Sequence, residues 1–224
     1  KKALIKLEQK IKKNNNHLSK NILEICCLAS YKSLNSYNWS SKLNNIEQVS
    51  SLVKRQVKDS KKEIEIKKIL KTKKIKNLIS LKVKDQYENS PYPRWEKIAL
   101  NHNKQRPLDF FNKLNLDVNH QKIKNWDIIN VLVAGCGTGQ HAITTATKYK
   151  NSLVTAIDLS MNSLSYAKRK ADELEIKNID FIQMDLLDFK NYERKFQIIE
   201  TIGVLHHMAE PYEGLRVLYD ILDS

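Results

Sequence analysis

The sequence predicts an α/β protein in which an open parallel sheet follows an α-helical amino-terminal region. From residue 129 onward, short apolar runs alternate with amphipathic segments across short connections, and this pattern is typical of parallel strands joined by right-handed crossover helices. Before residue 85, apolar residues recur at spacings of three and four, which indicates helices. The second part of the chain is therefore expected to form an open, Rossmann-like half-sheet.

The first 85 residues are expected to be a basic helical domain. Its predicted helices span residues 2–13, 17–35, 41–58 and 62–84. Segment 20–31 has the most compact apolar face, so we expect it to be the most deeply buried. The sequence contains no repeat of fixed period, and self-similarity therefore gives no support to a helical-repeat solenoid.

Positive charge is concentrated in this first region. Residues 1–85 carry 22 Lys and Arg against 7 Asp and Glu, whereas residues 86–224 carry 17 against 18. Among the basic residues of the first region, Arg55 alone is an arginine, and nucleic-acid sites favour arginine with interleaved aromatic side chains. A compositional bias is therefore the favoured explanation, and a nucleic-acid footprint is the alternative.

Residues 86–128 are expected to form a connector, with one or two short helices between residues 96 and 125. The connector begins with QYENSPYPRW, in which two prolines favour extended backbone. In a flexible linker, Tyr87, Tyr92 and Trp95 would expose much apolar area, so we expect an ordered segment.

The third predicted domain, residues 129–224, contains four strands and three helices. The strands are the apolar runs INVLVAG, LVTAID, IDFIQMD and FQIIETI, and amphipathic helices separate most of them. The strands span residues 129–135, 153–158, 179–185 and 196–202, and the helices span residues 140–150, 161–176 and 210–222.

The sharpest motif is the turn GCGTG at residues 135–139, between the first strand and its helix. Glycines there allow positive φ angles and let a ligand approach the backbone. A dinucleotide fingerprint would need a further glycine where this chain has Gln140. The motif therefore argues against a nicotinamide oxidoreductase, which stays an alternative.

Two carboxylates end the next strands. Asp158 ends the second strand, where a carboxylate can accept from ribose hydroxyls, and Asp185 ends the third. Ligands of open α/β sheets bind outside the carboxyl ends of the strands, so the glycine turn and both acids should border one crevice. The alternative is that strand-end aspartates cap helices, although Ser160 is expected to cap the second helix and leave Asp158 free.

Four segments resemble the successive motifs of class I S-adenosylmethionine-dependent methyltransferases. They are VLVAGCGTGQ, VTAIDLS, FIQMDLLDF and FQIIETIGVLHHMAEP. QYENSPYPRW and GVLHHM are most similar to segments of bacterial methyltransferases that carry an amino-terminal helical, often tetratricopeptide-type, region. The resemblance covers residues 129–222, and the first 85 residues match far less distinctively.

The resemblance implies S-adenosylmethionine as the cofactor. It implies that Asp158 holds the ribose hydroxyls, that Asp185 accepts from the adenine amino group, and that Gln140 and His141 lie near the cofactor carboxylate. The implied cofactor-binding residues are Gly135, Cys136, Gly137, Thr138, Gly139, Gln140, Asp158, Leu159, Met184, Asp185, Leu186, Thr201, Ile202 and Gly203.

The implied reaction is an in-line displacement that moves a methyl group to an acceptor, which is a small molecule, a protein or RNA. No catalytic residue is assigned, and the residues considered for the acceptor pocket are Tyr87, Tyr92, Trp95, His206 and His207. Packing between the connector and the sheet is the alternative role for each aromatic residue. No metal site is expected, because adjacent histidines point different ways and no ligand lies at suitable spacing.

The resemblance also predicts a sheet of order 3-2-1-4, truncated after strand four, whereas a complete class I domain has seven strands. Together with the opening Lys-Lys, this predicts a fragment of a longer protein. Strand four would then be an apolar edge, which a homo-oligomer or a missing carboxy-terminal segment would cover. The functional alternatives are a non-catalytic nucleoside-binding scaffold and a nucleic-acid-modifying methyltransferase guided by the basic region.

Composition narrows the expected location. No apolar run reaches the roughly 18 to 20 residues of a membrane span, and the opening lacks the apolar core of a secretory signal. The three cysteines, Cys26, Cys27 and Cys136, do not make a disulfide framework. We therefore expect a cytoplasmic protein that does not bind membranes.

Overall fold

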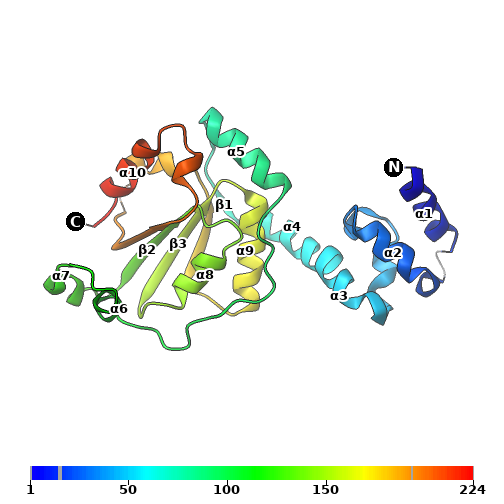
Figure 1. The fold of residues 1–224 in the computed structure, drawn as a ribbon, viewed down its shortest axis with the longest axis horizontal. Coiled ribbons are helices and arrows are strands. Elements are labelled where there is room, and N and C mark those ends of the chain that lie inside the picture. The colour runs from blue at the N-terminus through cyan, green and yellow to red at the C-terminus, as the bar shows by residue number, and fades with distance from the viewer. Residues whose placement is uncertain (1, 15–16, 193, 224) are drawn as a thin grey trace. The chain divides into compact units, whose positions relative to one another are not determined.

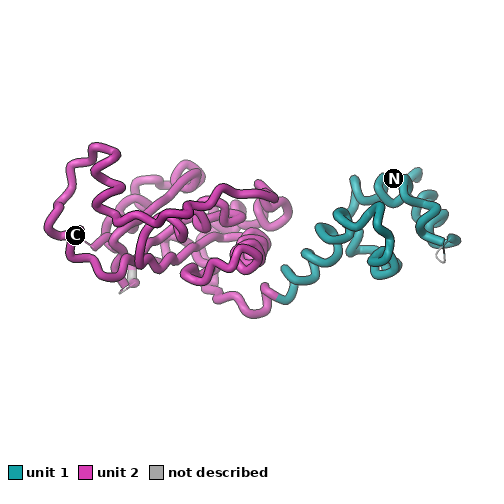
Figure 2. Tube along the Cα trace, turned by 90° about the horizontal axis from the view of Figure 1, so that it is seen from below, with its two compact units in different colours: residues 1–65 teal, residues 66–224 magenta. Residues whose placement is uncertain are grey.

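The computed structural model describes residues 2–14, 17–192 and 194–223. Lys1 and Ser224, the outer ends of the first and third predicted domains, lie outside these residues. The chain forms two compact units, residues 1–65 and 66–224, which are coloured separately in Figure 2. The domain boundaries that we predict after residues 85 and 128 stay predictions.

Unit 1 is helical, and most of its helices are short. Its helical elements are α1 (Lys2–Lys13), η1 (Leu18–Asn21), α2 (Ile22–Ala29), η2 (Leu34–Ser36), η3 (Ser40–Asn45), η4 (Glu47–Val49), α3 (Ser50–Val53) and η5 (Lys54–Lys58). Ile25 and Leu28 of α2 are buried, which confirms the buried face predicted for segment 20–31. They share a core with Ile11, Leu43 and Val53.

The single helices predicted for residues 17–35 and 41–58 are wrong, because 3-10 turns interrupt the first range and 3-10 turns and a π helix interrupt the second. In the first range, the Gln56 side chain accepts from the Leu34 backbone N–H and donates to the Ala29 carbonyl. These hydrogen bonds satisfy backbone groups that a continuous helix would have paired internally.

The helix predicted for residues 62–84 is also wrong. Helix α4 (Asp59–Ile69), in which the unit boundary falls, ends before the two-residue strand β1 (Lys71–Thr72). Helix α5 (Leu78–Asn89) then begins at an N-cap, because the Asn77 side chain accepts from the backbone N–H groups of Ile79 and Ser80 at 2.9 and 3.1 Å.

Unit 2 contains a parallel sheet of five strands in the order β1-β4-β3-β2-β5. The other strands are β2 (Ile129–Ala134), β3 (Ser152–Asp158), β4 (Ile179–Gln183) and β5 (Ile198–Thr201). The four predicted strands pair in the predicted order 3-2-1-4, but the predicted four-stranded sheet is wrong because β1 pairs with β4 as a fifth strand. Thr72 fixes this pairing, since its hydroxyl donates to the Gln183 side chain at 2.7 Å. Strand β5 forms the opposite edge.

Alternation along the strands separates two apolar cores. Val131 and Val133 face the core under helices α8 (Gln140–Ala146) and α9 (Met161–Glu173). Leu132 and Ala134 face the core under helix α10 (Pro211–Asp220) and the turn η6 (Leu186–Asn191). Figure 1 shows α8 and α9 beside the sheet strands in unit 2. Because both faces of β2 are covered, its sequence is apolar except at Asn130.

Two short helices precede β2, as predicted: α6 (Pro107–Lys113) and α7 (His120–Lys124). Helix α8 ends at Ala146, four residues earlier than predicted, because the chain then pairs with Gln105. The Gln105 N–H donates to the Lys148 carbonyl and the Gln105 carbonyl accepts from Lys150, both at 2.9 Å. The last short helical turn before α10 is η7 (Leu205–His207).

The segment before the sheet is ordered by contacts with the glycine turn. The Trp95 indole N–H donates to the Thr138 carbonyl at 3.0 Å, and the Thr138 hydroxyl donates to the Pro93 carbonyl at 2.6 Å. Trp95 is buried, whereas Tyr92 is 78% exposed. The packing role that was the alternative for Tyr92 is therefore wrong, whereas Trp95 does pack in the core.

In the part of the chain that the structure describes, no helix is both long and apolar enough to cross a membrane.

Candidate functional site

A cavity of about 370 Å³ lies in unit 2 at the carboxyl ends of the central strands. The predicted cofactor residues that line it are Gly135, Cys136, Gly137, Thr138, Gln140, Asp158, Leu159, Met184, Asp185, Leu186, Ile202 and Gly203. Tyr87, Tyr92 and His207 from the predicted acceptor set also line it. Within the described residues, Gly139, Thr201, Trp95 and His206 do not belong to this lining.

The glycine turn gives the cavity an open backbone floor. Gly135 and Gly137 have φ angles of +73° and +53°, in the left-handed region that glycine tolerates. A Cβ added to Gly135 would lie 2.0 Å from Val204 Cγ2, whereas one added to Gly137 would meet no atom closer than 4.0 Å. A side chain on Gly137 would therefore occupy space that the cavity leaves to a ligand.

Asp158 ends β3 and is held by the backbone on both carboxylate oxygens. Oδ2 accepts from the Gly137 N–H and Oδ1 from the Ser160 N–H, both at 2.8 Å. Ser160 caps α9 with its own hydroxyl, as predicted, by accepting from the Ser163 N–H. Each carboxylate oxygen keeps further lone-pair capacity for a ligand hydroxyl.

Burial raises the pKa of Asp158 above its usual value, and the nearby Glu88 carboxylate adds to the rise. The backbone hydrogen bonds from Ser160 and Gly137 lower the pKa but do not cancel the rise. The native protein therefore pays a desolvation cost to keep this carboxylate charged, and hydroxyl donors from a ligand would offset part of it.

Asp185 combines a structural contact with a place in the cavity wall. Its side chain caps η6 by accepting from the Leu187 N–H at 3.0 Å, and the residue is 4% exposed. The capping role that we kept as an alternative is thus present, and it leaves the second carboxylate oxygen for an amine donor.

Gly139 and Cys136 have roles that differ from ligand binding or catalysis. Gly139 has a φ of +82°, and an added Cβ would lie 2.5 Å from Ala167 Cβ, so this glycine lets α8 pack closely against α9. Burial raises the pKa of the Cys136 thiol well above its usual value, and the charge of Asp158 adds to this effect. Cys136 therefore lines the cavity with a buried thiol whose charged form is disfavoured.

Tyr87 and His207 come together at the cavity although 120 residues separate them. The Tyr87 hydroxyl lies 3.4 Å from His207 Nε2, and the two rings meet edge to face with centroids 6.2 Å apart. The ring of His206 lies 4.0 Å from that of His207. Among the described residues, no group of three or more His, Cys, Asp or Glu side chains is placed to hold a metal ion.

One wall of the cavity was predicted only at Tyr87. This wall is built by α5, on which Ile79, Val83 and Tyr87 line the cavity at intervals of four residues. The predicted helix ended at residue 84, so it did not place these three residues on one helix face. His141, which the resemblance placed near the cofactor carboxylate, also lines the cavity. The other lining residues that were not predicted are Asn77, Ser80, Pro93, Ile157, Leu187, Val204, Met208, Ala209, Glu210 and Glu213.

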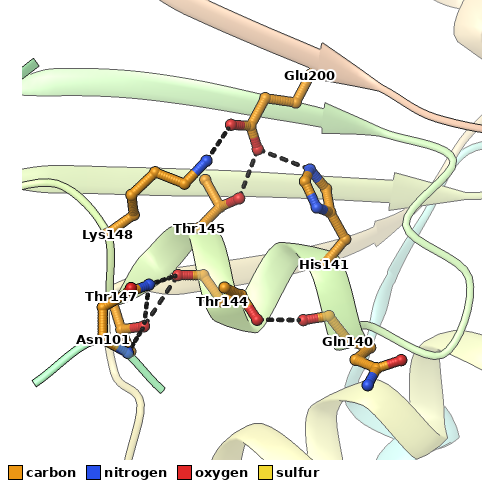
Figure 3. A network of polar contacts seen from close by, with 8 residues as sticks. All are labelled: Asn101, Gln140, His141, Thr144, Thr145, Thr147, Lys148 and Glu200. Carbon is orange, nitrogen blue, oxygen red and sulfur yellow. Dashed lines mark hydrogen bonds and ion pairs between the residues drawn. The ribbon is translucent and has the colours of Figure 1, made fainter. Parts of the chain in front are cut away.

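Figure 3 shows a polar network that centres on Glu200 of β5. The sequence does not predict this network. The Oε2 atom of Glu200 lies 2.8 Å from His141 Nε2, and its Oε1 accepts from Lys148 Nζ at 2.9 Å. The Thr145 hydroxyl also donates to Oε2. Burial alone would raise the pKa of Glu200, but the hydrogen bonds from His141, Thr145 and Lys148 outweigh burial and lower the pKa to about 2.

This lowered pKa makes an acid-stability prediction. A carboxyl whose folded pKa lies below its unfolded value of 4.5 stabilises the protein above pH 4.5 and loses that contribution as the pH falls toward 2. We expect Glu200 to contribute about 3 kcal/mol to the free energy of unfolding at pH 7 through this shift.

Urea unfolding of wild type and Glu200→Gln between pH 7 and pH 2.5 measures this contribution. The difference in the free energy of unfolding between the two proteins should shrink as the pH falls. A difference that stays constant over this range would contradict the assignment of the shift to Glu200.

Comparison with known proteins gives matches in this part of the chain. Residues 131–224 match a protein-family model described as a methyltransferase domain. An uncharacterised protein of Synechococcus sp. is 35% identical over 89 residues, which cover 39% of this chain and 21% of that protein. A probable (S)-tetrahydroprotoberberine N-methyltransferase of Papaver bracteatum is 35% identical over 78 residues, which cover 35% of this chain and 22% of that protein. The matched segments thus span about a fifth of these relatives' length.

Solved structures also match. Magnesium protoporphyrin IX methyltransferase from Synechocystis PCC 6803 with bound SAH aligns at 23% identity and a TM-score of 0.46, covering 64% of this chain and 68% of that chain. PKMT2 from Rickettsia typhi in complex with AdoHcy aligns at 25% identity and a TM-score of 0.42, covering 54% of this chain and 23% of that chain.

Residues 131–224 thus match the model of a methyltransferase domain, and they contain four strands of the parallel sheet and the glycine turn. The cofactor of this class of domain is S-adenosylmethionine. The residues present fit that group, because Gly137 leaves open space at the turn and the carboxylates of Asp158 and Asp185 suit its hydroxyl and amine donors.

Proposed function

We propose that unit 2 binds S-adenosylmethionine in this cavity and transfers its methyl group to an acceptor that enters beside α5. The observation that carries the proposal is the convergence of the glycine turn, Asp158 and Asp185 on one cavity. These residues lie at the ends of three different strands, and the parallel topology alone brings them together.

Asp158 and Asp185 are proposed to divide the adenosine between them. Asp158 would accept from the ribose hydroxyls with the lone pairs that Gly137 and Ser160 leave free. Asp185 would accept from the adenine amino group, with Met184 and Leu186 against the ring. Ile202 and Gly203 would border the reacting end.

The bound cofactor supplies a methyl group on a positively charged sulfur, which leaves readily when a nucleophile attacks in line. The chain's own task is to align the acceptor and exclude water, and such alignment supplies several kcal/mol of a reaction barrier. We propose that Tyr87 and His207 position the acceptor. If the attacking atom of the acceptor carries a proton, His207 accepts that proton.

If His207 acts on the acceptor, its substitution should lower the rate of methyl transfer without changing the affinity for the cofactor product. His207→Ala is expected to lower methyl transfer about 100-fold or more, because it removes a proton acceptor, and to leave affinity for S-adenosylhomocysteine unchanged. Methyl transfer is measured with tritiated S-adenosylmethionine and fractionated cell extract, and affinity by calorimetry. His206→Ala is the matched control, since His206 lies beside His207 and outside the cavity lining. Equal loss of activity in both variants would count against the role of His207.

The proposal as a whole is tested by isothermal titration of the full chain with S-adenosylhomocysteine. Saturable one-site binding is the expected result, and no binding to the folded protein would overturn the proposal. Binding without methyl transfer to any extract fraction would favour the nucleoside-binding scaffold. Fluorescence titration with reduced nicotinamide cofactor tests the oxidoreductase alternative, which Gln140 argues against.

The acceptor stays open among a small molecule, a protein and RNA. A steep salt dependence of RNA binding would favour the nucleic-acid alternative, because contacts between lysines and phosphates release counterions. The cytoplasmic location, the bacterial type, the tetratricopeptide-type character of the amino-terminal region and a homo-oligomer stay predictions. The free thiols of Cys26, Cys27 and Cys136 support the reducing compartment that we propose.

A further inference from the structure

The charged residues that line the cavity are acidic, although the chain as a whole is basic. The acidic lining residues are Asp158, Asp185, Glu210 and Glu213. Among the described lining residues there is no lysine or arginine, although the chain contains 39 of them. The basic side chains that remain in the lining are the imidazoles of His141 and His207.

A ligand with a carboxylate, such as the amino-acid end of S-adenosylmethionine, needs hydrogen-bond donors in this acidic lining. Basic side-chain donors for a carboxylate are limited to these two imidazoles among the described lining residues, and His207 is already in contact with Tyr87. His141 is the second residue of α8, the helix that directly follows the glycine turn. It is therefore the basic side chain nearest in sequence to that turn.

The contact with Glu200 restricts the orientation of the His141 ring. Nε2 lies 2.8 Å from Glu200 Oε2, a close contact that favours a proton on Nε2, although the angle at Nε2 lies outside that of a regular hydrogen bond. The other ring nitrogen, Nδ1, points away from Glu200 (Figure 3). A carboxylate that contacts one imidazole nitrogen selects the tautomer and fixes the orientation of the ring.

Glu200 is itself held firmly. Its side chain is 15% exposed, and Thr145 of α8 and Lys148, which follows α8, donate to its two oxygens. Because Thr145 and His141 belong to the same helix, the carboxylate, α8 and the imidazole form one network.

We propose that Glu200 is a positioning residue that fixes the His141 imidazole with Nδ1 available to the carboxylate of the bound cofactor. This inference rests on the proposed function. It adds that β5 contributes to cofactor recognition through a side chain that lies outside the cavity lining. A solely structural role, in which the network only ties β5 to α8, is the competing explanation.

Two ligands separate the explanations. S-Adenosylhomocysteine carries the amino-acid end, and 5′-methylthioadenosine lacks it while keeping the adenosine. Glu200→Gln presents either an oxygen or an amide NH₂ to the ring, so the ring loses its single orientation. We expect this variant to weaken S-adenosylhomocysteine about tenfold, the loss of roughly one hydrogen bond to a charged group, and to leave 5′-methylthioadenosine within twofold.

Lys148→Met is the matched control, because it removes the partner on the far oxygen of Glu200 and leaves the contact with His141. It should lower thermal stability without selective loss of S-adenosylhomocysteine. Equal weakening of both ligands by Glu200→Gln, or the same selective loss in Lys148→Met, would overturn the proposal in favour of the structural role.

A double-mutant cycle tests whether Glu200 acts through His141. His141→Phe should cost as much S-adenosylhomocysteine affinity as Glu200→Gln, and the double variant should cost no more than His141→Phe alone. Additive losses would contradict the proposal. The ¹⁵N chemical shifts of His141 in the ligand-free protein supply an independent readout, in which wild type shows one tautomer and Glu200→Gln a mixture. Failure of wild type to bind S-adenosylhomocysteine would instead refute the proposed function, and the ¹⁵N readout does not depend on it.

Discussion

Replacing Asp158 with asparagine is expected to weaken S-adenosylhomocysteine binding about 100-fold, because asparagine keeps one acceptor oxygen and loses one hydrogen bond to a charged acceptor, which is worth about 1.5 to 3 kcal/mol. The hydrogen bonds around Asp158 do not tolerate a change from carboxylate to amide. Both carboxylate oxygens face backbone N–H groups, from Gly137 and Ser160. An asparagine amide would turn its own NH₂ toward one of these donors, so the variant loses an acceptor and gains a repulsive contact.

Calorimetric titration of wild type and Asp158→Asn measures the effect, and Asp180→Asn is the matched control. Asp180 lies on the neighbouring strand β4, but its side chain is 70% exposed and pairs with Lys71. The control should bind like wild type. An Asp158→Asn variant that binds within threefold of wild type would remove the main support for the ribose contact.

Asp158 also predicts how affinity depends on pH. Burial raises its pKa above the model-peptide value of 3.8, so its charged form is lost at a higher pH than in an exposed aspartate. Because the charged form is the better acceptor, affinity for S-adenosylhomocysteine should rise as the pH rises through this pKa and then level off. The Asp158→Asn variant should lack this dependence.

The sequence was sufficient for the parts of the site that topology dictates. Asp158 and Asp185 follow apolar runs, and parallel strands bring such ends to one edge of the sheet. The sequence was not sufficient for β1. Lys71 and Thr72 are exposed on both faces, and two polar residues carry no strand periodicity. Their pairing depends on Gln183, more than 100 residues away.

Glu200 escaped prediction for a related reason. It lies in an apolar run, where the sequence indicates only a strand. Its partners His141 and Lys148 lie more than 50 residues earlier, and they reach it because the register of β2 and β5 pairs Val133 with Glu200. Such a contact is a property of strand register and helix packing, and single-sequence patterns specify neither.

Substituting alanine for Gly139 is expected to lower the free energy of unfolding by about 3 kcal/mol, through two effects that add. A residue with a Cβ at a φ of +82° costs about 1 to 2 kcal/mol. The new Cβ would also lie 2.5 Å from Ala167 Cβ and 3.1 Å from Ala167 Cα, and overpacking of this kind costs about 1 to 3 kcal/mol. Because one contact is with backbone, α8 and α9 must separate to relieve it.

Gly203→Ala isolates the backbone effect, since Gly203 has a φ of +72° and an added Cβ would meet nothing within 4 Å. Urea unfolding followed by circular dichroism should show a loss of about 1 kcal/mol for Gly203→Ala. Combining Gly139→Ala with Ala167→Gly should recover part of the stability, because it removes the closest atom. Equal losses for the two glycine variants would show that Gly139 is required only for its backbone angle, and the close packing of α8 on α9 would then lose its role in the energetic argument.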